Sequence, residues 1–298
     1  MKYIIDTDPG IDDAVAIMLG YLNGLDIIGF TLADGNIRLE HSINNIKVIE
    51  DFLESNIPIY KSSERNPFKN RTAEYAHGVR GLGYTVYPEN KRVVEKKSAE
   101  DFIIKASKKY KDNLTVVCFG ALTNLANAIR KDPKIVKRLK HIVIMGSSYD
   151  EELEELYKEF NFGVDPQSAK LVLETPFEDI KIVTHEFGIK ALIDENYIYS
   201  LEHSDKLTSQ FLSSISRKYI DFGHIKYKVI GMVCPDPITM ASIIDPTIIE
   251  FEPCKVQVYI SEKKRGTCNI ELVEDSNIKI SYKLDLKKYT KLFKNTFN

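Results

Sequence analysis

Short apolar runs alternate along the chain with stretches whose apolar positions recur at helical spacing. The runs at 114–119 and 141–145 are apolar at nearly every position, as expected of strands buried on both faces. Pro166 favours the start of a helix, because proline is tolerated at the first helical position. The pattern predicts strands at 3–5, 26–31, 114–119, 141–145 and 181–184, and helices at 14–22, 41–53, 122–129, 166–173, after Pro237 and at 286–293.

Three further apolar segments, at 255–260, 267–272 and 278–284, are predicted to be antiparallel edge strands near the C-terminus. The alternation as a whole predicts an α/β fold with one open, mostly parallel sheet and helices on both faces. We find no linker or repeat that interrupts this pattern, so we expect a single domain over 1–298. In such sheets ligands bind beyond the carboxyl ends of the strands, and we expect the functional site there.

Composition narrows the classes of partner. The 298 residues include 41 basic and 43 acidic side chains, so a net charge of −2 gives no electrostatic case for nucleic acid or an anionic membrane. No apolar run reaches the roughly 18 residues of a membrane span, and the N-terminal run is too short for a signal peptide. The four cysteines lack the spacing of a disulfide framework. We therefore expect a cytoplasmic protein with reduced thiols.

Four carboxylates follow the first predicted strand, in the sequence DTDPGIDD at 6–13. A polar turn with a helix cap would account for one or two of them. Asp6 and Asp8 would point to the same side of a strand, and carboxylates about 4 Å apart repel by about 4 kcal/mol at an effective dielectric near 20. A divalent cation would remove this repulsion. Oxygen ligands without a neighbouring His or Cys pair suit Ca²⁺ or Mg²⁺ rather than zinc.

The segment at 6–13 resembles the N-terminal signature of the nucleoside hydrolases, the family that prefers inosine and uridine. Further segments resemble motifs of that family in the same order along the chain. They are ADGN at 33–36, HGVRGLG at 77–83, FGALTN at 119–124, EFN at 159–161, DP at 165–166 and DP at 236–237. The resemblance extends over essentially the whole chain.

The resemblance implies Ca²⁺-dependent hydrolysis of the N-glycosidic bond of ribonucleosides, which releases ribose and a nucleobase. It implies that the metal ligands are Asp8, Asp13, Asp236 and the backbone carbonyl of Phe119. The Ca²⁺ also holds the nucleophilic water in this family, and Asp8 is then the general base. Asp6 is expected either to join the ligands or only to orient the loop through local hydrogen bonds.

For the substrate, the resemblance implies that Asp12 and Asn161 hold the ribose 2′- and 3′-hydroxyls beside Asn36, and that Glu159 accepts from the 5′-hydroxyl. Carboxylates around the ribose would stabilise the positive charge of an oxocarbenium-like transition state. The expected partner is a small-molecule ribonucleoside. By analogy with the family we also expect a homodimer or a homotetramer.

One departure from the family pattern concerns the leaving group. Many members carry a histidine directly before the late Asp, where it is proposed to protonate the departing base, and here Pro235 stands in that place. His224, Tyr227 and Tyr219 precede it in a region that covers the base in the family, and His77 lies in another loop. We expect one of these four to be the substitute acid, with His224 and Tyr227 on one helix face, and Tyr219, Tyr227 and His77 to contact the substrate.

A second departure is the acidic stretch at 147–158, where relatives have a Gly-rich turn and an Asn for the 5′-hydroxyl. This stretch is compatible with a short amphipathic helix. The departures leave two other interpretations open: a relative that acts on a modified riboside, or one that binds ribosides without turnover. A Mg²⁺-dependent phosphohydrolase with an aspartyl nucleophile in a D-x-D motif fits less well, because Pro9 follows where that class has a Gly-Thr-like turn.

Overall fold

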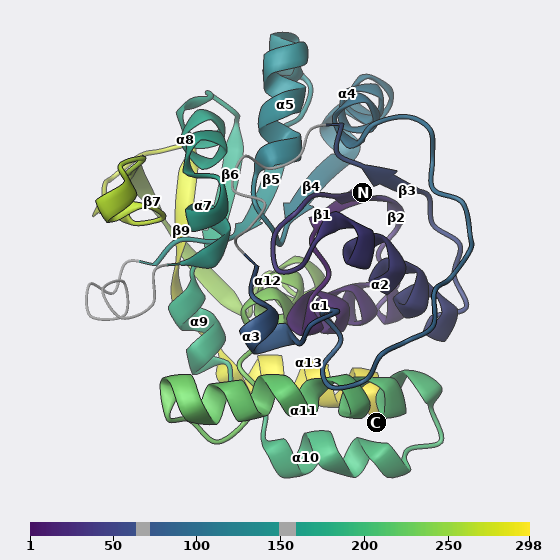
Figure 1. The fold of residues 1–298 in the computed structure, drawn as a ribbon. Coiled ribbons are helices and arrows are strands. Elements are labelled where there is room, and N and C mark those ends of the chain that lie inside the picture. Colours follow the sequence, from purple (N-terminus) through teal and green to yellow (C-terminus); the bar gives the residue numbers. More distant parts are fainter. Residues whose placement is uncertain (64–71, 149–158) are drawn as a thin grey trace.

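The computed structural model describes residues 1–63, 72–148 and 159–298, and these residues form one sheet of nine strands with helices around it (Figure 1). The spatial order of the strands is β3-β2-β1-β4-β5-β6-β9-β7-β8. The strands are β1 (Lys2–Thr7), β2 (Ile27–Leu32), β3 (Ile59–Lys61), β4 (Leu114–Cys118), β5 (His141–Met145), β6 (Asp179–Val183), β7 (Ile249–Val258), β8 (Cys268–Leu272) and β9 (Ile278–Leu284). The predicted α/β fold with a mostly parallel sheet is confirmed.

The three C-terminal strands extend this sheet in a mixed arrangement. β9 pairs in parallel with β6, whereas β7 is antiparallel to both β9 and β8. The predicted antiparallel strands are therefore present, but β9 lies inside the sheet and β8 forms its edge. β7 also begins at Ile249, six residues before the predicted start, because its first half alternates apolar Ile249 and Phe251 with acidic residues that the apolar-run criterion passes over.

The helices cover both faces of the sheet and also close its carboxyl edge. They are α1 (Ile11–Leu22), α2 (Leu39–Phe52), α3 (Glu74–His77), α4 (Ala99–Tyr110), α5 (Thr123–Lys131), α7 (Phe160–Val164), α8 (Pro166–Glu174), α9 (His185–Lys190), α10 (Glu195–Ser200), α11 (Leu207–Tyr227), α12 (Pro235–Ile244) and α13 (Leu286–Phe297). The helices predicted from the sequence are all present within a few residues. The stretch 149–158, with its possible amphipathic helix, lies outside the described residues.

The continuous apolar runs are buried on both faces because successive side chains enter different cores. In β4, Val117 joins the core under α1 and α12, while Val116 and Cys118 join the core under α4, α5 and α8. The two cores follow from the period of two along a strand, which sends neighbouring side chains to opposite faces. Alternating burial of this kind holds the strands rigid, so the residues that follow them are fixed in space.

α11 closes the carboxyl edge of the sheet. It is 21 residues long and runs across the molecule beside α1 and α3, with α10 and α13 packed nearby (Figure 1). Its buried residues, among them Phe211, Ile215 and Tyr219, recur at intervals of four as expected for one face of a helix. The loops after the strands therefore face a helical wall rather than solvent.

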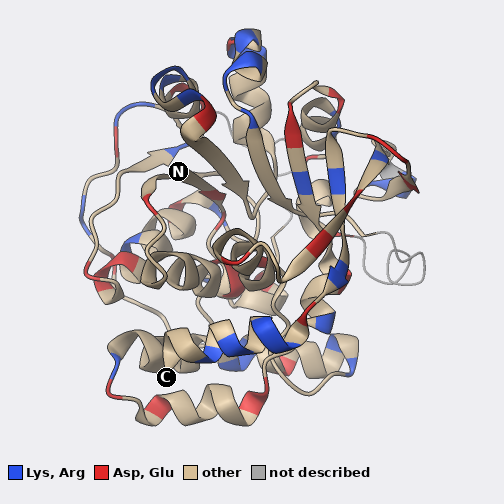
Figure 2. Ribbon diagram, turned by 180° about the vertical axis from the view of Figure 1, so that it is seen from behind, with Lys and Arg blue, Asp and Glu red and all other residues tan. Residues whose placement is uncertain are grey.

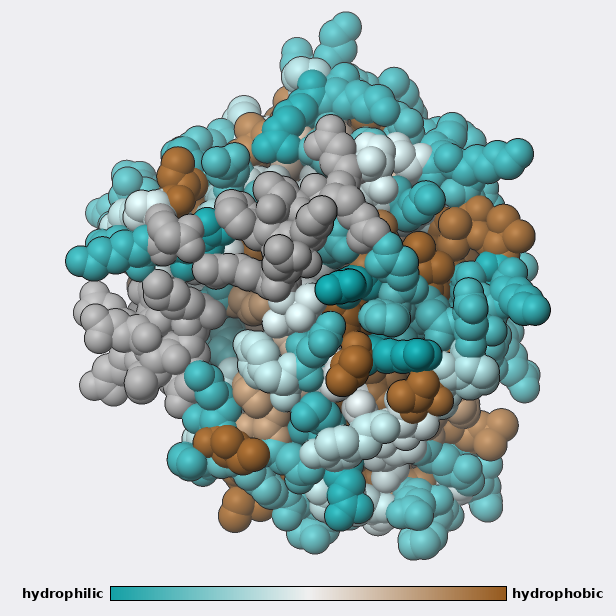
Figure 3. All heavy atoms as spheres, viewed as in Figure 1, coloured by the Kyte–Doolittle hydropathy of each residue, from teal (hydrophilic) through white to brown (hydrophobic). Residues whose placement is uncertain are grey.

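Basic and acidic residues are interspersed along the helices and strands in the view from behind (Figure 2). The opposite side is mostly hydrophilic, and its apolar side chains occur in small separate groups (Figure 3). Among the helices of the described ranges, none combines the length and the apolar character that crossing a membrane requires.

Candidate active site

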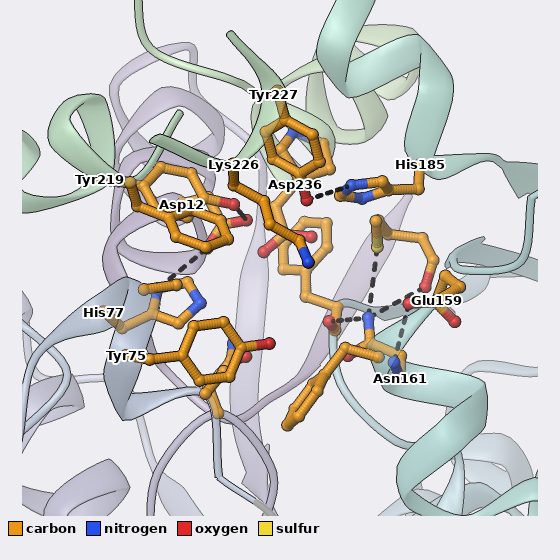
Figure 4. A pocket seen from close by; sticks show the side chains of 18 residues that line it. Asp12, Tyr75, His77, Glu159, Asn161, His185, Tyr219, Lys226, Tyr227 and Asp236 are labelled. Atoms are coloured by element: carbon orange, nitrogen blue, oxygen red, sulfur yellow. Dashed lines mark hydrogen bonds and ion pairs between the residues drawn. The ribbon is translucent and has the colours of Figure 1, made fainter. Parts of the chain in front are cut away.

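A cavity of about 360 Å³ lies where the parallel strands end (Figure 4). Its lining includes Phe119 after β4, Met145 at the end of β5 and His185 after β6. Residues of α3, α7 and α11 and of the first turns of α1 and α12 also line it. The position agrees with the rule that open α/β sheets bind ligands beyond the carboxyl ends of their strands, and the volume lies in the usual range for small-molecule sites.

At one end of this cavity, three buried carboxylates converge from two helices. Asp12 and Asp13 lie in the first turn of α1, and Asp236 lies in the first turn of α12. One oxygen of each lies within 4.8 Å of the others, a spacing that a single metal ion can bridge. The helix termini favour this placement, since the N-terminus of a helix carries partial positive charge. Asp236 is not itself an N-cap, because Cys234 holds that position in the structure.

Asp8 lies behind these three residues in a closely fitting cradle. Its Oδ2 accepts a hydrogen bond of 2.6 Å from the backbone N–H of Asn36. A Cβ atom at Gly35 would overlap that oxygen, and one at Gly120 would lie 2.7 Å from Oδ1. The glycines of the ADGN and FGALTN segments are therefore required sterically, because any side chain there would displace the Asp8 carboxylate.

Hydrogen bonds orient the other two carboxylates of the first motif. Asp13 accepts from the Thr7 hydroxyl at Oδ1 and, at Oδ2, from the backbone of Gly10 and the side chain of Asn36, both at 3.0 Å. Asp12 Oδ2 accepts from the Tyr219 hydroxyl at 3.0 Å. Asp12 Oδ1 is buried and has no hydrogen-bond partner among the described residues. An orphaned carboxylate oxygen beside other carboxylates fits a cation or a substrate hydroxyl.

Asp6 has a different role from its neighbours. Its Oδ1 accepts from the hydroxyl of Thr31 at 2.6 Å and from the side-chain amide of Asn124 at 2.7 Å. It does not line the cavity. Of the two roles expected for Asp6, the structure therefore supports local hydrogen bonding, which ties β1 to β2 and to the start of α5.

The electrostatics of the carboxylates reflect crowding away from water. Burial, and then the charge of Asp13, raise the pKa of Asp8 well above its usual range. Burial raises the pKa of Asp12 and Asp13 to about 6, and burial and the other three carboxylates raise that of Asp236 well above normal. Such shifts mean that ionising these carboxyl groups in the folded protein costs free energy. A bound divalent cation would offset this cost. The donor set, made only of oxygens, fits Ca²⁺ or Mg²⁺.

His77 is held as a neutral ring against the first motif. The backbone N–H of Ile11 donates to its Nδ1 at 3.1 Å, and a Cβ atom at Gly10 would lie 2.6 Å from the same nitrogen. Burial lowers the pKa of His77 to about 4, so the ring is neutral and its proton is on Nε2. The 3.6 Å approach of Nδ1 to Asp12 Oδ1 is therefore not an ion pair, since that nitrogen has no proton to share.

Glu159 and Asn161 form the opposite wall. The Glu159 carboxylate caps α7 by accepting from the backbone N–H groups of Asn161 at 2.7 Å and Phe162 at 2.8 Å, and burial raises its pKa to about 7. The amide nitrogen of Asn161 donates to the carbonyl of Phe119 at 2.6 Å. The Oδ1 atom of Asn161 is therefore the acceptor that remains for a ligand in the cavity.

Aromatic rings form a wall at the other end of the cavity. Tyr219 stacks on His77 with centroids 5.0 Å apart and on Phe222 at 6.0 Å. Phe222 in turn meets Tyr75 and Tyr227, each at 5.6 Å. A planar ligand group would find a stacking surface here, whereas the carboxylate end suits hydroxyls and a cation. The cavity thus has two chemically distinct halves.

Comparison with known proteins agrees with this arrangement. The family profile described as inosine-uridine preferring nucleoside hydrolase matches residues 3–291. The chain belongs to this family. It is 28% identical to the inosine-uridine preferring nucleoside hydrolase of Crithidia fasciculata, over 97% of this chain and 94% of that protein. It is 30% identical to the probable uridine nucleosidase 2 of Arabidopsis thaliana, over 93% and 88% of the two chains.

The fold of this nucleoside hydrolase is also that of solved relatives. It superimposes on a plant nucleoside hydrolase with a TM-score of 0.90 and 26% identity, over 99% of this chain and 98% of the other. A purine-preferring ribonucleoside hydrolase from Gardnerella vaginalis gives a TM-score of 0.86 at 25% identity, over 100% and 98%. Hydrolysis of a ribonucleoside N-glycosidic bond is thus the activity of the family and of this site.

The structure brings most of the predicted site residues of the hydrolase together. The cavity or the carboxylates behind it include Asp8, Asp12, Asp13, Asn36, His77, Phe119, Glu159, Asn161, Tyr219, Tyr227 and Asp236. His224 is the exception: it does not line the cavity, and its Nε2 lies 2.7 Å from Glu195 Oε2. At about 100° per residue, His224 lies roughly 140° around α11 from Tyr219, so it points away from the aromatic wall.

The cavity residues of the hydrolase that were not foreseen include Tyr75, His185, Phe222 and Lys226. His185 has a signal in the sequence, because it directly follows the strand predicted at 181–184 and strand ends carry ligand sites. Phe222 and Lys226 stand three and seven residues after Tyr219, which is helical spacing on one face. Tyr75 lies close to a segment outside the described residues and carries no comparable signal.

The carboxylate cluster predicts how stability depends on pH and metal. Asp12 and Asp13 have a pKa of about 6 in the folded chain and the ordinary value of 3.8 when unfolded. The folded state therefore binds more protons, and stability should fall as pH rises from about 4 to 7. We expect the unfolding midpoint of the metal-free protein to fall over this range, and added Ca²⁺ to raise it more at pH 7.5 than at pH 5. A midpoint unaffected by Ca²⁺ at both pH values would contradict the metal site.

The position of His224 predicts that it takes no part in the reaction. The His224→Ala variant should keep kcat/KM for ribonucleoside hydrolysis within about twofold, because His224 does not line the cavity. Steady-state kinetics of the purified variant test this. A tenfold loss of kcat/KM that is confined to ribonucleosides, in a variant whose Ca²⁺-dependent unfolding midpoint is unchanged, would identify His224 as the acid after all.

Proposed function

We propose that the protein hydrolyses ribonucleosides with one Ca²⁺ ion held by Asp8, Asp13, Asp236 and the backbone carbonyl of Phe119. The observation that carries this proposal is the group of buried carboxylates near the strand ends: burial first, and then the charges of neighbouring carboxylates, raise the pKa of Asp8, Asp13 and Asp236. Ca²⁺ suits the set because it accepts many oxygen ligands in flexible geometry, including backbone carbonyls, whereas Mg²⁺ demands near-octahedral order. Phe119 lines the same cavity.

When bound, the cation supplies positive charge that makes a neighbouring water molecule more acidic. Asp8 accepts the proton of the attacking water. The hydrogen bond from the Asn36 backbone fixes the carboxylate, so little reorganisation is needed when it takes the proton.

The ribose lies over the carboxylates in this proposal. Asp12 Oδ1 has no partner among the described residues, and Asn161 Oδ1 is the free acceptor of its amide, so each accepts from a ribose 2′- or 3′-hydroxyl. Asn36 lies beside them, and Glu159 accepts from the 5′-hydroxyl. As the glycosidic bond breaks, positive charge develops on the sugar, and this ring of carboxylates stabilises it.

The base lies against the aromatic wall formed by Tyr75, His77, Tyr219, Phe222 and Tyr227. Stacking on aromatic side chains favours any planar base, which suits relatives named for uridine, for inosine and for purines. Uridine and inosine are therefore the substrates to test first. A cytoplasmic location and a homodimer or homotetramer stay predictions from the sequence and the family.

The position of Asp6 argues against a D-x-D phosphohydrolase. An aspartyl nucleophile must face the substrate, and Asp6 is buried outside the cavity with one oxygen accepting two hydrogen bonds. A binder without turnover would not need Asp8 in its cradle of Gly35 and Gly120. Ribose release from a panel of nucleosides, measured with Ca²⁺ and with a chelator, tests the proposal against both alternatives.

Asp8→Asn should reduce kcat for uridine or inosine by at least about 100-fold, because general-base help is typically worth 10²–10⁴. Ca²⁺ affinity is measured alongside by the shift in unfolding midpoint, since Asp8 is also a proposed ligand. Asp26→Asn, an exposed residue paired with Lys2 at the other end of β1, is the matched control. A purified Asp8→Asn protein with near-normal kcat would refute the assignment of the base.

The ribose contacts predict strong discrimination against 2′-deoxyribonucleosides. A site built to bond a hydroxyl leaves buried polar groups unpaired when that hydroxyl is missing, and the cost can reach 10⁴-fold in kcat/KM. We expect at least a 100-fold preference for uridine over deoxyuridine, and Asp12→Asn should reduce this preference. Equal kcat/KM for the two substrates would contradict the roles of Asp12 and Asn161.

A further inference from the structure

His185 and Tyr227 form a hydrogen-bonded pair inside the cavity, although they are 42 residues apart in sequence. His185 Nε2 lies 2.8 Å from the hydroxyl oxygen of Tyr227, and both side chains line the cavity (Figure 4). His185 is the first residue of α9, one residue after the end of β6, and Tyr227 is the last residue of α11. The pair therefore joins a rigid strand end to the helix that covers the cavity.

The pair lies at the end of the cavity that takes the base. Tyr227 packs edge-on against Phe222, which belongs to the aromatic wall. The packing of α9 against α12 sets the position of His185, because a Cβ atom at Gly188 would lie 2.6 Å from the Cα of Pro235. His185 thus enters the cavity beside the first residue of α12.

Other donors at this end are less suited to protonate a departing base. The Tyr219 hydroxyl donates to Asp12. His77 receives the Ile11 N–H, so its remaining proton is that of a neutral imidazole, a far weaker acid than a phenol. Pro235 lines the cavity and carries no proton to give. Tyr227 combines a phenolic hydroxyl, whose ordinary pKa is about 10, with a partner that fixes its direction.

We propose that Tyr227 donates the proton to the leaving base and that His185 is the positioning residue that directs and supports its hydroxyl. The inference rests on the proposed ribonucleoside hydrolysis. As the bond between C1′ and the base nitrogen breaks, the electron pair stays with the base, and the Tyr227 proton moves to the base. The resulting tyrosinate accepts a hydrogen bond from the Nε2–H of His185 and is reprotonated by solvent water after the base departs.

Two features of the surroundings favour this step. Burial lowers the pKa of His185 to about 4, so the ring is neutral. Of its two neutral tautomers, the one with the proton on Nε2 can donate to the tyrosinate. The ammonium group of Lys226, next to Tyr227 in sequence, points into the same cavity (Figure 4). A positive charge there stabilises negative charge on the tyrosine oxygen or on the departing base.

The test compares two substrates with different leaving groups. Uridine needs a proton on its base, whereas the p-nitrophenolate of p-nitrophenyl β-D-ribofuranoside leaves without one. Tyr227→Phe should lower kcat/KM for uridine about 100-fold or more and change that of the activated riboside less than threefold. His185→Ala should show the same selectivity, with a loss of about tenfold or more for uridine. His185→Gln, whose amide can still donate to the tyrosine, should lose less kcat/KM for uridine than His185→Ala does.

The double variant separates a working pair from two independent residues. If His185 acts through Tyr227, the double variant should lose no more than Tyr227→Phe alone, within about threefold. The proposal would be overturned if the loss of kcat/KM in the double variant equals the product of the two single losses. It would also be overturned if the variants lose the same factor on both substrates. His141→Gln, a partly exposed histidine paired with Asp179 outside the cavity, is the control and should leave both rates unchanged. The Ca²⁺-dependent unfolding midpoint of each variant shows that the fold and the carboxylate end are intact.

The unmodified protein distinguishes this inference from the proposed function. If the protein cleaves none of the three substrates, uridine, inosine and the activated riboside, ribonucleoside hydrolysis itself is refuted. Cleavage of the activated riboside alone would keep the hydrolase and overturn the acid, because no group would then protonate a nucleobase. Cleavage of uridine with unselective variants would likewise remove only the roles of Tyr227 and His185.

Discussion

The mutual repulsion of carboxylates that are shut away from water is the constraint on which the rest of this structure depends. Burial raises the pKa of Asp8, Asp12, Asp13 and Asp236, and the charges of neighbouring carboxylates raise the pKa of all of these but Asp12 further. Backbone donors, such as the N–H groups of Gly10 and Asn36, offset part of the cost of ionising these carboxyl groups. The helix N-termini, which carry partial positive charge, do the same. What remains is a demand for positive charge, which the proposed Ca²⁺ ion would meet.

Several glycines leave the room that the side chains of the site need. Gly35 and Gly120 leave room for the Asp8 carboxylate. In the loop after α3, Gly78 has a φ of +90° and a Cβ atom there would overlap the carbonyl of Gly83, so only glycine fits. This turn holds His77 over Gly10. The motif glycines therefore matter because they allow the charged groups to approach the backbone closely.

The two halves of the cavity rest on different kinds of support. The carboxylate half belongs to strand ends and first helical turns, which two cores hold from both faces of the sheet. The aromatic half belongs mainly to α11, α3 and α9, which lie across the carboxyl edge. The groups proposed to meet the sugar and those proposed to meet the base therefore lie on separate elements of the fold. The pair of His185 and Tyr227, with Pro235 beside them, fits that division.

The sequence by itself determined the α/β architecture and the carboxylate half of the site, because strand period and short motifs such as 6–13 act over a few residues. It did not indicate that His185, rather than His224, lines the cavity. His224 is close in sequence to Tyr227, but its angle around α11 turns it toward Glu195. His185 is distant, yet packing of α9 on α12 carries it into the cavity. Only tertiary contacts set such orientations, since they depend on how separate elements pack.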